Sequence, residues 1–224
     1  MSTNGTQSIW INGCEEWIRE GQSNGWRAYY TNFMFEPLHG TTQGIINQMH
    51  VAIHREFYIK FMLRFVRDPH RQREAERMPQ LMLFPDRPVW KQEKGSMKEV
   101  TINSGGLHFN GPMLIPPVSR FHGCPIKHIK EYQARYTRDR IARIHVVEID
   151  GNVHRIADYA VKSVKWHRVD PDDILLLPKA LSEVKNASMP LDSGQKGIKD
   201  IQSSLNVSDD IASRIVESVA RTES

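Results

Sequence analysis

The sequence predicts an α+β fold in which an antiparallel sheet is packed with helices. Residues 27–35 are rich in aromatic and β-branched side chains, which favour a strand, whereas residues 45–67 repeat apolar side chains at helical spacing. Short apolar runs bounded by Pro and Gly follow from residue 80 onward. The order strand, helix, short strands, basic helix and hairpin is typical of an antiparallel sheet with helices laid against it.

A chain of 224 residues suits one domain with appendages. We expect an N-terminal extension over residues 1–26, the domain over 27–180, and a linker with a C-terminal helix over 181–224. The last segment is rich in Ser, Asn, Asp and Gly before an amphipathic stretch with Ile211 and Ile215 on one face. The C-terminal helix would act in docking or homo-oligomerisation. The alternative is that this segment is simply a frayed end.

The sequence argues against membrane, secretory and disulfide-rich classes. No run approaches the roughly eighteen apolar residues of a membrane span. The polar residues 1–7 lack the basic-then-apolar pattern of a signal peptide. Cys14 and Cys124 are far apart and form no C-x-x-C pair, so we expect two reduced thiols. These features predict a cytoplasmic protein that is not bound to a membrane.

The first strand and the first long helix are each defined by their periodicity. In the strand over 27–35, Tyr29, Thr31, Phe33 and Phe35 alternate and would share the buried face. The helix over 45–67 has an apolar residue at every fourth position, namely Met49, Ile53, Phe57 and Phe61.

Further along the chain we expect short strands and two more helices. The predicted strands are residues 80–84, 99–102, 107–115, 144–149 and 153–156, and 174–177 is a brief apolar run. The predicted helices are residues 126–143, which are basic, and 158–165. Asp150-Gly151-Asn152 would form the turn of a hairpin between the strands 144–149 and 153–156.

Two polar side chains stand out on the strand over 107–115. Because side chains alternate along a strand, His108 and Asn110 point to one face, while Leu107 and Phe109 point to the other. Two potential metal ligands would thus stand side by side on a sheet whose other face is buried. The alternative is a half-exposed strand with an ordinary surface histidine.

Positive charge is concentrated in one part of the chain. The whole chain has a net charge of +4, whereas residues 120–168 contain eleven Lys and Arg against five Asp and Glu, a net of +6. Such a stretch suits an anionic partner such as nucleic acid. A solvated helical face gives similar counts, so both interpretations stay open.

Three motifs in this order resemble those of the HUH-type endonucleases, a family of rolling-circle replication initiators, relaxases and single-strand transposases. The aromatic strand resembles motif one, His108-Phe109-Asn110-Gly111 resembles motif two, and Tyr159-Ala160-Val161-Lys162 resembles motif three. The similarity covers roughly residues 27–180. It implies the HUH-endonuclease (Rep-like) fold, and the nicking and joining of single-stranded DNA during replication of a plasmid, phage or other mobile element.

The resemblance also implies a nucleophile and a path for the DNA. Tyr159 would attack a phosphodiester and become linked to the 5′ phosphate. Lys162, three residues later on a helix, would approach the same phosphate. The single strand would be held by basic residues of the 126–143 segment, namely Lys127, Lys130, Arg135 and Arg138.

A metal ion is the third implication. His108 and Asn110 would hold Mg²⁺ or Mn²⁺, which would polarise the phosphate. Asp86 and Glu93 are the candidates for an acidic third ligand. Asn110 departs from the family pattern, which usually has a second histidine there, and an amide binds metal less strongly.

Two other functions stay open at this point. The chain would be a relative of the family that holds nucleic acid without cutting it, or a structural protein that binds partners through its C-terminal helix. Tyr159 would then pack on the sheet with its hydroxyl at the surface, and Lys162 would be a solvated surface lysine.

Overall fold

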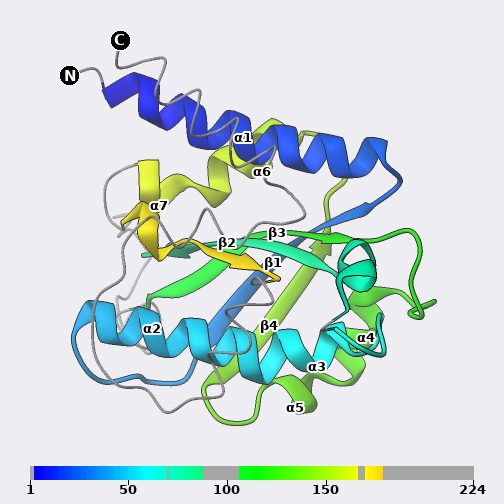
Figure 1. The fold of residues 1–224 in the computed structure, drawn as a ribbon. Coiled ribbons are helices and arrows are strands. Elements are labelled where there is room, and N and C mark those ends of the chain that lie inside the picture. The colour runs from blue at the N-terminus through cyan, green and yellow to red at the C-terminus, as the bar shows by residue number, and fades with distance from the viewer. Residues whose placement is uncertain (1–2, 70, 88–105, 166–169, 179–224) are drawn as a thin grey trace.

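The computed structural model of the protein contains a five-stranded antiparallel sheet between two layers of helices (Figure 1). It describes residues 3–69, 71–87, 106–165 and 170–178. The strands are β1 (Arg27–Phe35), β2 (Gln80–Asp86), β3 (His108–Ile115), β4 (Ile141–Glu148) and β5 (Leu175–Leu177). They lie in the order β4-β1-β3-β2-β5, and every neighbouring pair is antiparallel. The predicted α+β class is therefore confirmed.

Helices cover both faces of this sheet. The longer ones are α1 (Thr3–Ser23), α2 (Thr42–Ala52), α4 (Pro125–Glu131) and α6 (Val153–Ala160). Short ones are α3 (Ile59–Met62), α5 (Gln133–Tyr136) and α7 (Lys162–Lys165). A π-helical segment (Ile53–Tyr58) and two 3₁₀ turns (Gln72–Arg77 and Pro171–Asp173) complete the described elements.

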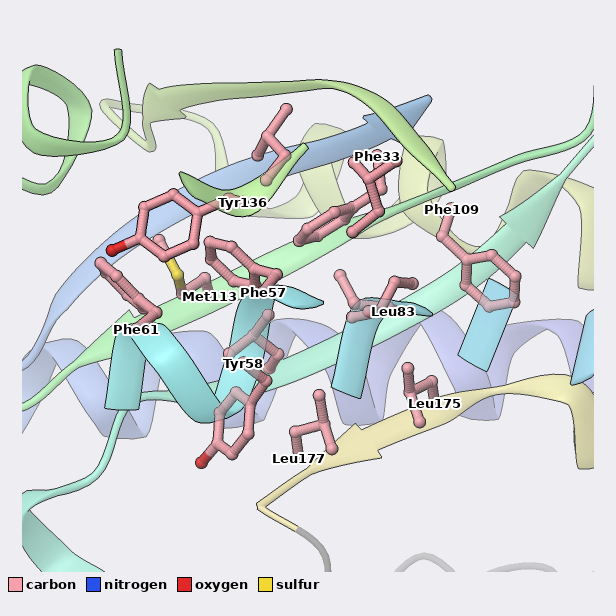
Figure 2. Close-up of a cluster of buried hydrophobic side chains, with 14 of the residues drawn as sticks. Phe33, Phe57, Tyr58, Phe61, Leu83, Phe109, Met113, Tyr136, Leu175 and Leu177 are labelled. Carbon is pink, nitrogen blue, oxygen red and sulfur yellow. The ribbon is translucent and has the colours of Figure 1, made fainter. Parts of the chain in front are cut away.

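One face of the sheet packs against α2, the π-helical segment and α3, which together form one unbroken helical run (Figure 1). Its core is aromatic: Phe33 of β1 lies 5.0 Å from Phe57 between ring centroids, and Phe57 lies 5.4 Å from Tyr136 of α5 (Figure 2). The predicted helix is confirmed, and so is the buried face of the first strand. Helices α4 and α5 belong to this layer, because Ile129 and Tyr136 are buried in the same core.

The opposite face packs against α1, α6 and α7 (Figure 1). Ile11, Trp17 and Ile18 of α1 are buried in one cluster with Phe84 of β2 and Leu114 of β3. The segment predicted as an N-terminal extension is therefore largely a helix that forms part of the domain core.

The predicted hairpin over 144–156 is wrong, because its second half is helical. The Asn152 side chain accepts a hydrogen bond from the Arg155 backbone N–H at 3.0 Å and so caps the start of α6. Val153 and Ala157, one turn apart on the same face of this helix, are both buried. Residues 153–156 do not alternate as a strand would: their apolar side chains, Val153 and Ile156, are three residues apart, a spacing that fits one face of a helix.

The predicted helix over 126–143 is too long. It ends with α5 at Tyr136, and the chain enters β4 at Ile141. Ile144 and Val146 are buried, while His145 between them is exposed, as expected of a strand with one covered face. The predicted strand over 99–102, the linker and the C-terminal helix lie outside the described residues. Within the part that is described, no helix is long and apolar enough to cross a membrane.

Gly111 lies where β2 and β3 approach too closely for a side chain. A Cβ atom at this position would lie 2.1 Å from the carbonyl oxygen of Met82 and 3.1 Å from the Cα of Leu83. The Gly111 carbonyl also accepts a hydrogen bond of 2.9 Å from the Thr31 hydroxyl on β1. The packing of β2 against β3 therefore explains why position 111 of the His-Phe-Asn-Gly sequence is a glycine, whatever the chemistry at His108.

We predict that Gly111→Ala lowers the free energy of unfolding by about 3 kcal/mol, because backbone of β2 would have to move. Gly151→Ala is the control, since Gly151 has a φ of +88° and no atom within 4 Å of the added Cβ. The control pays only the backbone cost, about 1 kcal/mol. Chemical denaturation of both variants measures the difference, and equal losses would contradict this account.

Candidate functional site

A cluster of five polar side chains lies on the α1/α6/α7 face of the sheet, at the end of β2 and the start of β3. We call it the Asp86 cluster: Asp86, His108, Asn110, Lys162 and Ser163. Four of the residues predicted to act at the metal or with the phosphate meet here: Asp86, His108, Asn110 and Lys162.

The pairing of β2 with β3 brings the first three together. Asp86 lies directly opposite His108 in the register, so their side chains emerge on the same face. Asn110 follows on that face two residues later. Its Nδ2 is 3.3 Å from Asp86 Oδ2 and 3.4 Å from His108 Nε2, and the last two atoms are 3.6 Å apart. The prediction that His108 and Asn110 share a face is confirmed.

The orientation of the His108 ring is fixed by the backbone. Its Nδ1 lies 3.0 Å from the carbonyl oxygen of Gly106, which can only accept, so Nδ1 carries the proton of the neutral ring. Nε2 is then the nitrogen with the free lone pair. It points into the Asp86 cluster, as a metal ligand would require.

Asp86 is the buried centre of the cluster, with a side chain 2% exposed. Lys162 Nζ donates to Asp86 Oδ2 at 2.8 Å, and the Ser163 hydroxyl donates to Oδ1. Asn110 Nδ2 donates to Oδ2 as well. A buried carboxylate is tolerated only when its charge is compensated and its oxygens are hydrogen-bonded, and Lys162 and Ser163 provide both for Asp86.

Ser163 was not found from the sequence. It is fully buried on α7, and besides donating to Asp86 it accepts a hydrogen bond of 3.2 Å from the Arg87 backbone N–H. A serine next to a lysine has no distinctive pattern. Only the contact between α7 and β2 reveals that Ser163 joins the two elements.

Tyr159 lies beside the cluster and is 48% exposed. Lys162 Nζ lies 5.0 Å from the centroid of its ring, and the Tyr30 ring packs edge-on at 5.9 Å. The sequence placed Tyr159 and Lys162 on one helix, whereas the helix breaks at Val161 between α6 and α7. The two side chains still meet, so contacts of 5.0, 2.8 and 3.6 Å lead from Tyr159 through Lys162 and Asp86 to His108.

Three buried polar atoms near this cluster lack a hydrogen-bond partner among the described residues: Tyr30 Oη, Asn32 Oδ1 and Asn110 Oδ1. Asn32 lies opposite Asn110 in the register, and Tyr30 is two residues away on the same face. Burial also raises the pKa of Tyr30. Buried polar atoms are normally paired, so three unpaired ones close to the Asp86 cluster leave acceptors and a hydroxyl that a bound water or ion would satisfy.

The donor set fits a divalent metal ion. Neighbouring ligands around Mg²⁺ or Mn²⁺, with bonds of about 2.1 Å, lie roughly 3.0 Å apart, close to the 3.3 to 3.6 Å found among the three atoms. A half-turn of an asparagine amide group about its last side-chain bond exchanges the positions of its nitrogen and its oxygen. A half-turn of Asn110 would direct its unpaired Oδ1 to the position that Nδ2 now holds.

The amide is essential to this interpretation. Throughout the described ranges, no three His, Cys, Asp or Glu side chains gather closely enough to hold a metal ion. The candidate ligands are therefore one imidazole, one carboxylate and one amide oxygen. Glu93, the other acidic candidate, lies outside the described residues.

The predicted nucleic-acid residues lie elsewhere. Lys127 and Lys130 are exposed on α4, Arg135 is exposed on α5, and Arg138 follows in the loop before β4. The Arg135 guanidinium lies 4.6 Å above the Tyr132 ring. Helices α4 and α5 belong to the α2/α3 layer, across the sheet from the Asp86 cluster (Figure 1).

Two basic residues on β4 share the open face with the Asp86 cluster. His145 lies opposite Asn32, and Arg143 lies opposite Met34. Both are exposed, and Met34 is 41% exposed, so the helical layer does not cover this part of the sheet. We call Met34, Arg143 and His145 the open sheet face. Sequence reasoning assigned no role to these residues, because their place on the same face as Asn32 and Asn110 depends on the strand order.

The chain matches no protein-family model, and no curated protein or solved structure is significantly similar to it. The geometry of the Asp86 cluster must therefore support any functional assignment by itself.

We predict that Ser163→Ala lowers the free energy of unfolding by about 2 kcal/mol, since it leaves Asp86 Oδ1 and the Arg87 N–H without their partner. Ser119→Ala is the control, because Ser119 makes only hydrogen bonds within its own loop. Chemical denaturation of both variants provides the measurement. A loss at Ser163 no larger than that at Ser119 would contradict the role given to Ser163.

Proposed function

We propose that the protein nicks and joins single-stranded DNA, with Tyr159 as the nucleophile and the Asp86 cluster as the phosphate-activating site. The single observation that carries the proposal is the series of contacts from Tyr159 through Lys162 and Asp86 to His108. Asp86 and His108 are far in sequence from Tyr159 and Lys162. Their meeting beside an exposed tyrosine agrees with the HUH-type fold inferred from the sequence motifs.

The proposed first step is a transfer of the phosphoryl group to tyrosine. The Tyr159 oxygen forms a bond to phosphorus while the bond from phosphorus to the 3′ oxygen breaks. The phenol loses its proton, the departing 3′ oxygen gains one, and the 5′ phosphate remains on the protein. Attack by a 3′ hydroxyl on this phosphotyrosine reverses the step and joins the strand.

The surrounding residues would serve this step through charge. The Lys162 ammonium, 5.0 Å from the centroid of the Tyr159 ring, can bind a phosphate oxygen beside that tyrosine. Asp86 and His108, with Asn110, would hold Mg²⁺ or Mn²⁺, which when bound supplies Lewis-acid polarisation of the phosphate. Asp86 holds the Lys162 ammonium beside Tyr159.

A non-cutting relative of the fold is the second candidate. Asn110 favours it, because an amide is a weaker metal ligand than the usual second histidine. Both candidates predict binding of single-stranded DNA, and only the first predicts a covalent product. Either role belongs to the replication of a plasmid, phage or other mobile element, and so to the cytoplasm that holds the DNA.

Incubation with single-stranded DNA and Mn²⁺ is expected to give a protein–DNA adduct that survives SDS electrophoresis. Tyr159→Phe should abolish the adduct, because the replacement lacks the attacking oxygen. Tyr132→Phe is the matched control, since Tyr132 lies on the α2/α3 side of the sheet, and it should leave the adduct unchanged. DNA binding without any adduct would favour the non-cutting relative, and no binding would exclude both.

We further propose that the bound strand crosses the open sheet face before it reaches the basic residues of α4 and α5. Arg143 and His145 are both exposed on this face, beside the exposed Met34, and both can donate hydrogen bonds to phosphate oxygens.

The double substitution Arg143→Ala with His145→Ala should weaken DNA binding about tenfold near physiological salt and reduce the salt dependence, because phosphate contacts release counterions. The pair Lys127→Ala and Lys130→Ala, which also removes two basic side chains, should have a smaller effect. Gel shifts over a range of salt concentrations measure both. A larger effect at Lys127 and Lys130 would place the strand on α4 instead.

A further inference from the structure

Lys162 already holds the carboxylate oxygen that a metal ion would need. Its Nζ lies 2.8 Å from Asp86 Oδ2, the same atom that faces His108 Nε2 and Asn110 Nδ2. The other oxygen, Oδ1, accepts from the Ser163 hydroxyl within a fully buried contact. The only carboxylate of the cluster thus presents one oxygen to two possible cations.

We propose that Lys162 is the resident counter-ion of Asp86, and that a divalent metal ion displaces its ammonium from Asp86 Oδ2 toward Tyr159 and the phosphate. This inference rests on the proposed function and adds a regulatory step to it. In the metal-free protein, the lysine neutralises a buried carboxylate. In the metal-loaded protein, the metal neutralises it, and the lysine becomes available to the DNA.

The electrostatics of the site favour this exchange. Two cations on one oxygen repel each other, and the repulsion is poorly screened because the Asp86 side chain is 2% exposed. Without metal, loss of the ammonium would leave the carboxylate buried and unpaired. Asp86 therefore favours one full cationic partner at a time.

The position of Lys162 gives the released ammonium somewhere to go. Its side chain is 29% exposed, and its Nζ already lies 5.0 Å from the Tyr159 ring centroid. A change of side-chain rotamer alone can take the ammonium away from Asp86. A phosphate beside Tyr159 would then stabilise the displaced lysine, so metal and DNA would strengthen each other's binding.

The decisive experiment titrates Mn²⁺ into the full-length protein without DNA and follows free Mn²⁺ by electron paramagnetic resonance. Lys162→Met, which keeps the apolar stem but removes the charge, should tighten Mn²⁺ binding at least tenfold. Lys162→Arg keeps the competing charge and should bind like the wild type. Lys165→Met is the matched control, because Lys165 sits on the same helix and pairs with Asp158 instead. It should also bind like the wild type.

A second measurement uses the wild-type protein, so it does not depend on how the variant folds. Reductive methylation followed by mass spectrometry should modify Lys162 several times faster with saturating Mn²⁺ than without it, since the paired ammonium is protected. Lys165 is the internal reference, and its rate should not change.

Equal or weaker Mn²⁺ binding by Lys162→Met, or no saturable binding by either protein, would overturn the exchange. Slower or unchanged methylation of Lys162 with Mn²⁺ would overturn it as well. Neither measurement uses DNA or catalysis. A protein that forms the Tyr159 adduct but fails these tests would retain the proposed function and lose only this inference.

Discussion

The double burial of strand β3 constrains everything else in the structure. It is the middle strand of five, and from Phe109 to Ile115 every residue is buried, because helices cover both faces of the sheet. A strand in this position has no place for polar side chains except where a helical layer ends. His108 and Asn110 lie at that end, which is why two polar residues on β3 are compatible with a stable core.

The same constraint explains why the site is built around a carboxylate from the neighbouring strand. The register places Asp86 opposite His108, at the last residue of β2, beyond the three residues that pair with β5. There α7 supplies Lys162 and Ser163 in place of apolar side chains. The layer of α1, α6 and α7 thus changes from apolar packing to charge pairing within the short distance from Phe84 to Asp86.

How much of this was predictable depends on the range of each interaction. The face of β1, the long helical run and the pairing of His108 with Asn110 follow from periodicity, which is a local property of the chain. The start of α6 did not follow, since Asn152 is equally suited to a turn and to a helix cap, and the choice is made by burial of Val153 and Ala157. Helix α1 was predicted only as an N-terminal extension, because its apolar residues are few and are separated by polar ones.

The site shows the same division. His108 and Asn110 are neighbours in sequence, and Tyr159 and Lys162 are three residues apart, so each pair was accessible to sequence reasoning. The connection between the pairs passes through Asp86, which lies 24 residues from Asn110 and 76 from Lys162. No periodicity of the sequence extends over such separations. The role of Ser163 could not be predicted from the sequence at all. Strand order and the packing of α7 decide which of several acidic residues meets the histidine.

The distribution of basic residues along the sequence did not predict where the charges of the candidate site lie. The basic residues that stand out in the sequence lie on α4 and α5, across the sheet from Tyr159. At the Asp86 cluster, a single lysine and a single buried carboxylate set the local field. Because the charge of a buried carboxylate is screened far less than charges on the solvated surface, the pair of Asp86 and Lys162 outweighs the surface excess within the Asp86 cluster. The surface charge can attract a polyanion, but the geometry around Asp86 determines what happens to a phosphate that arrives.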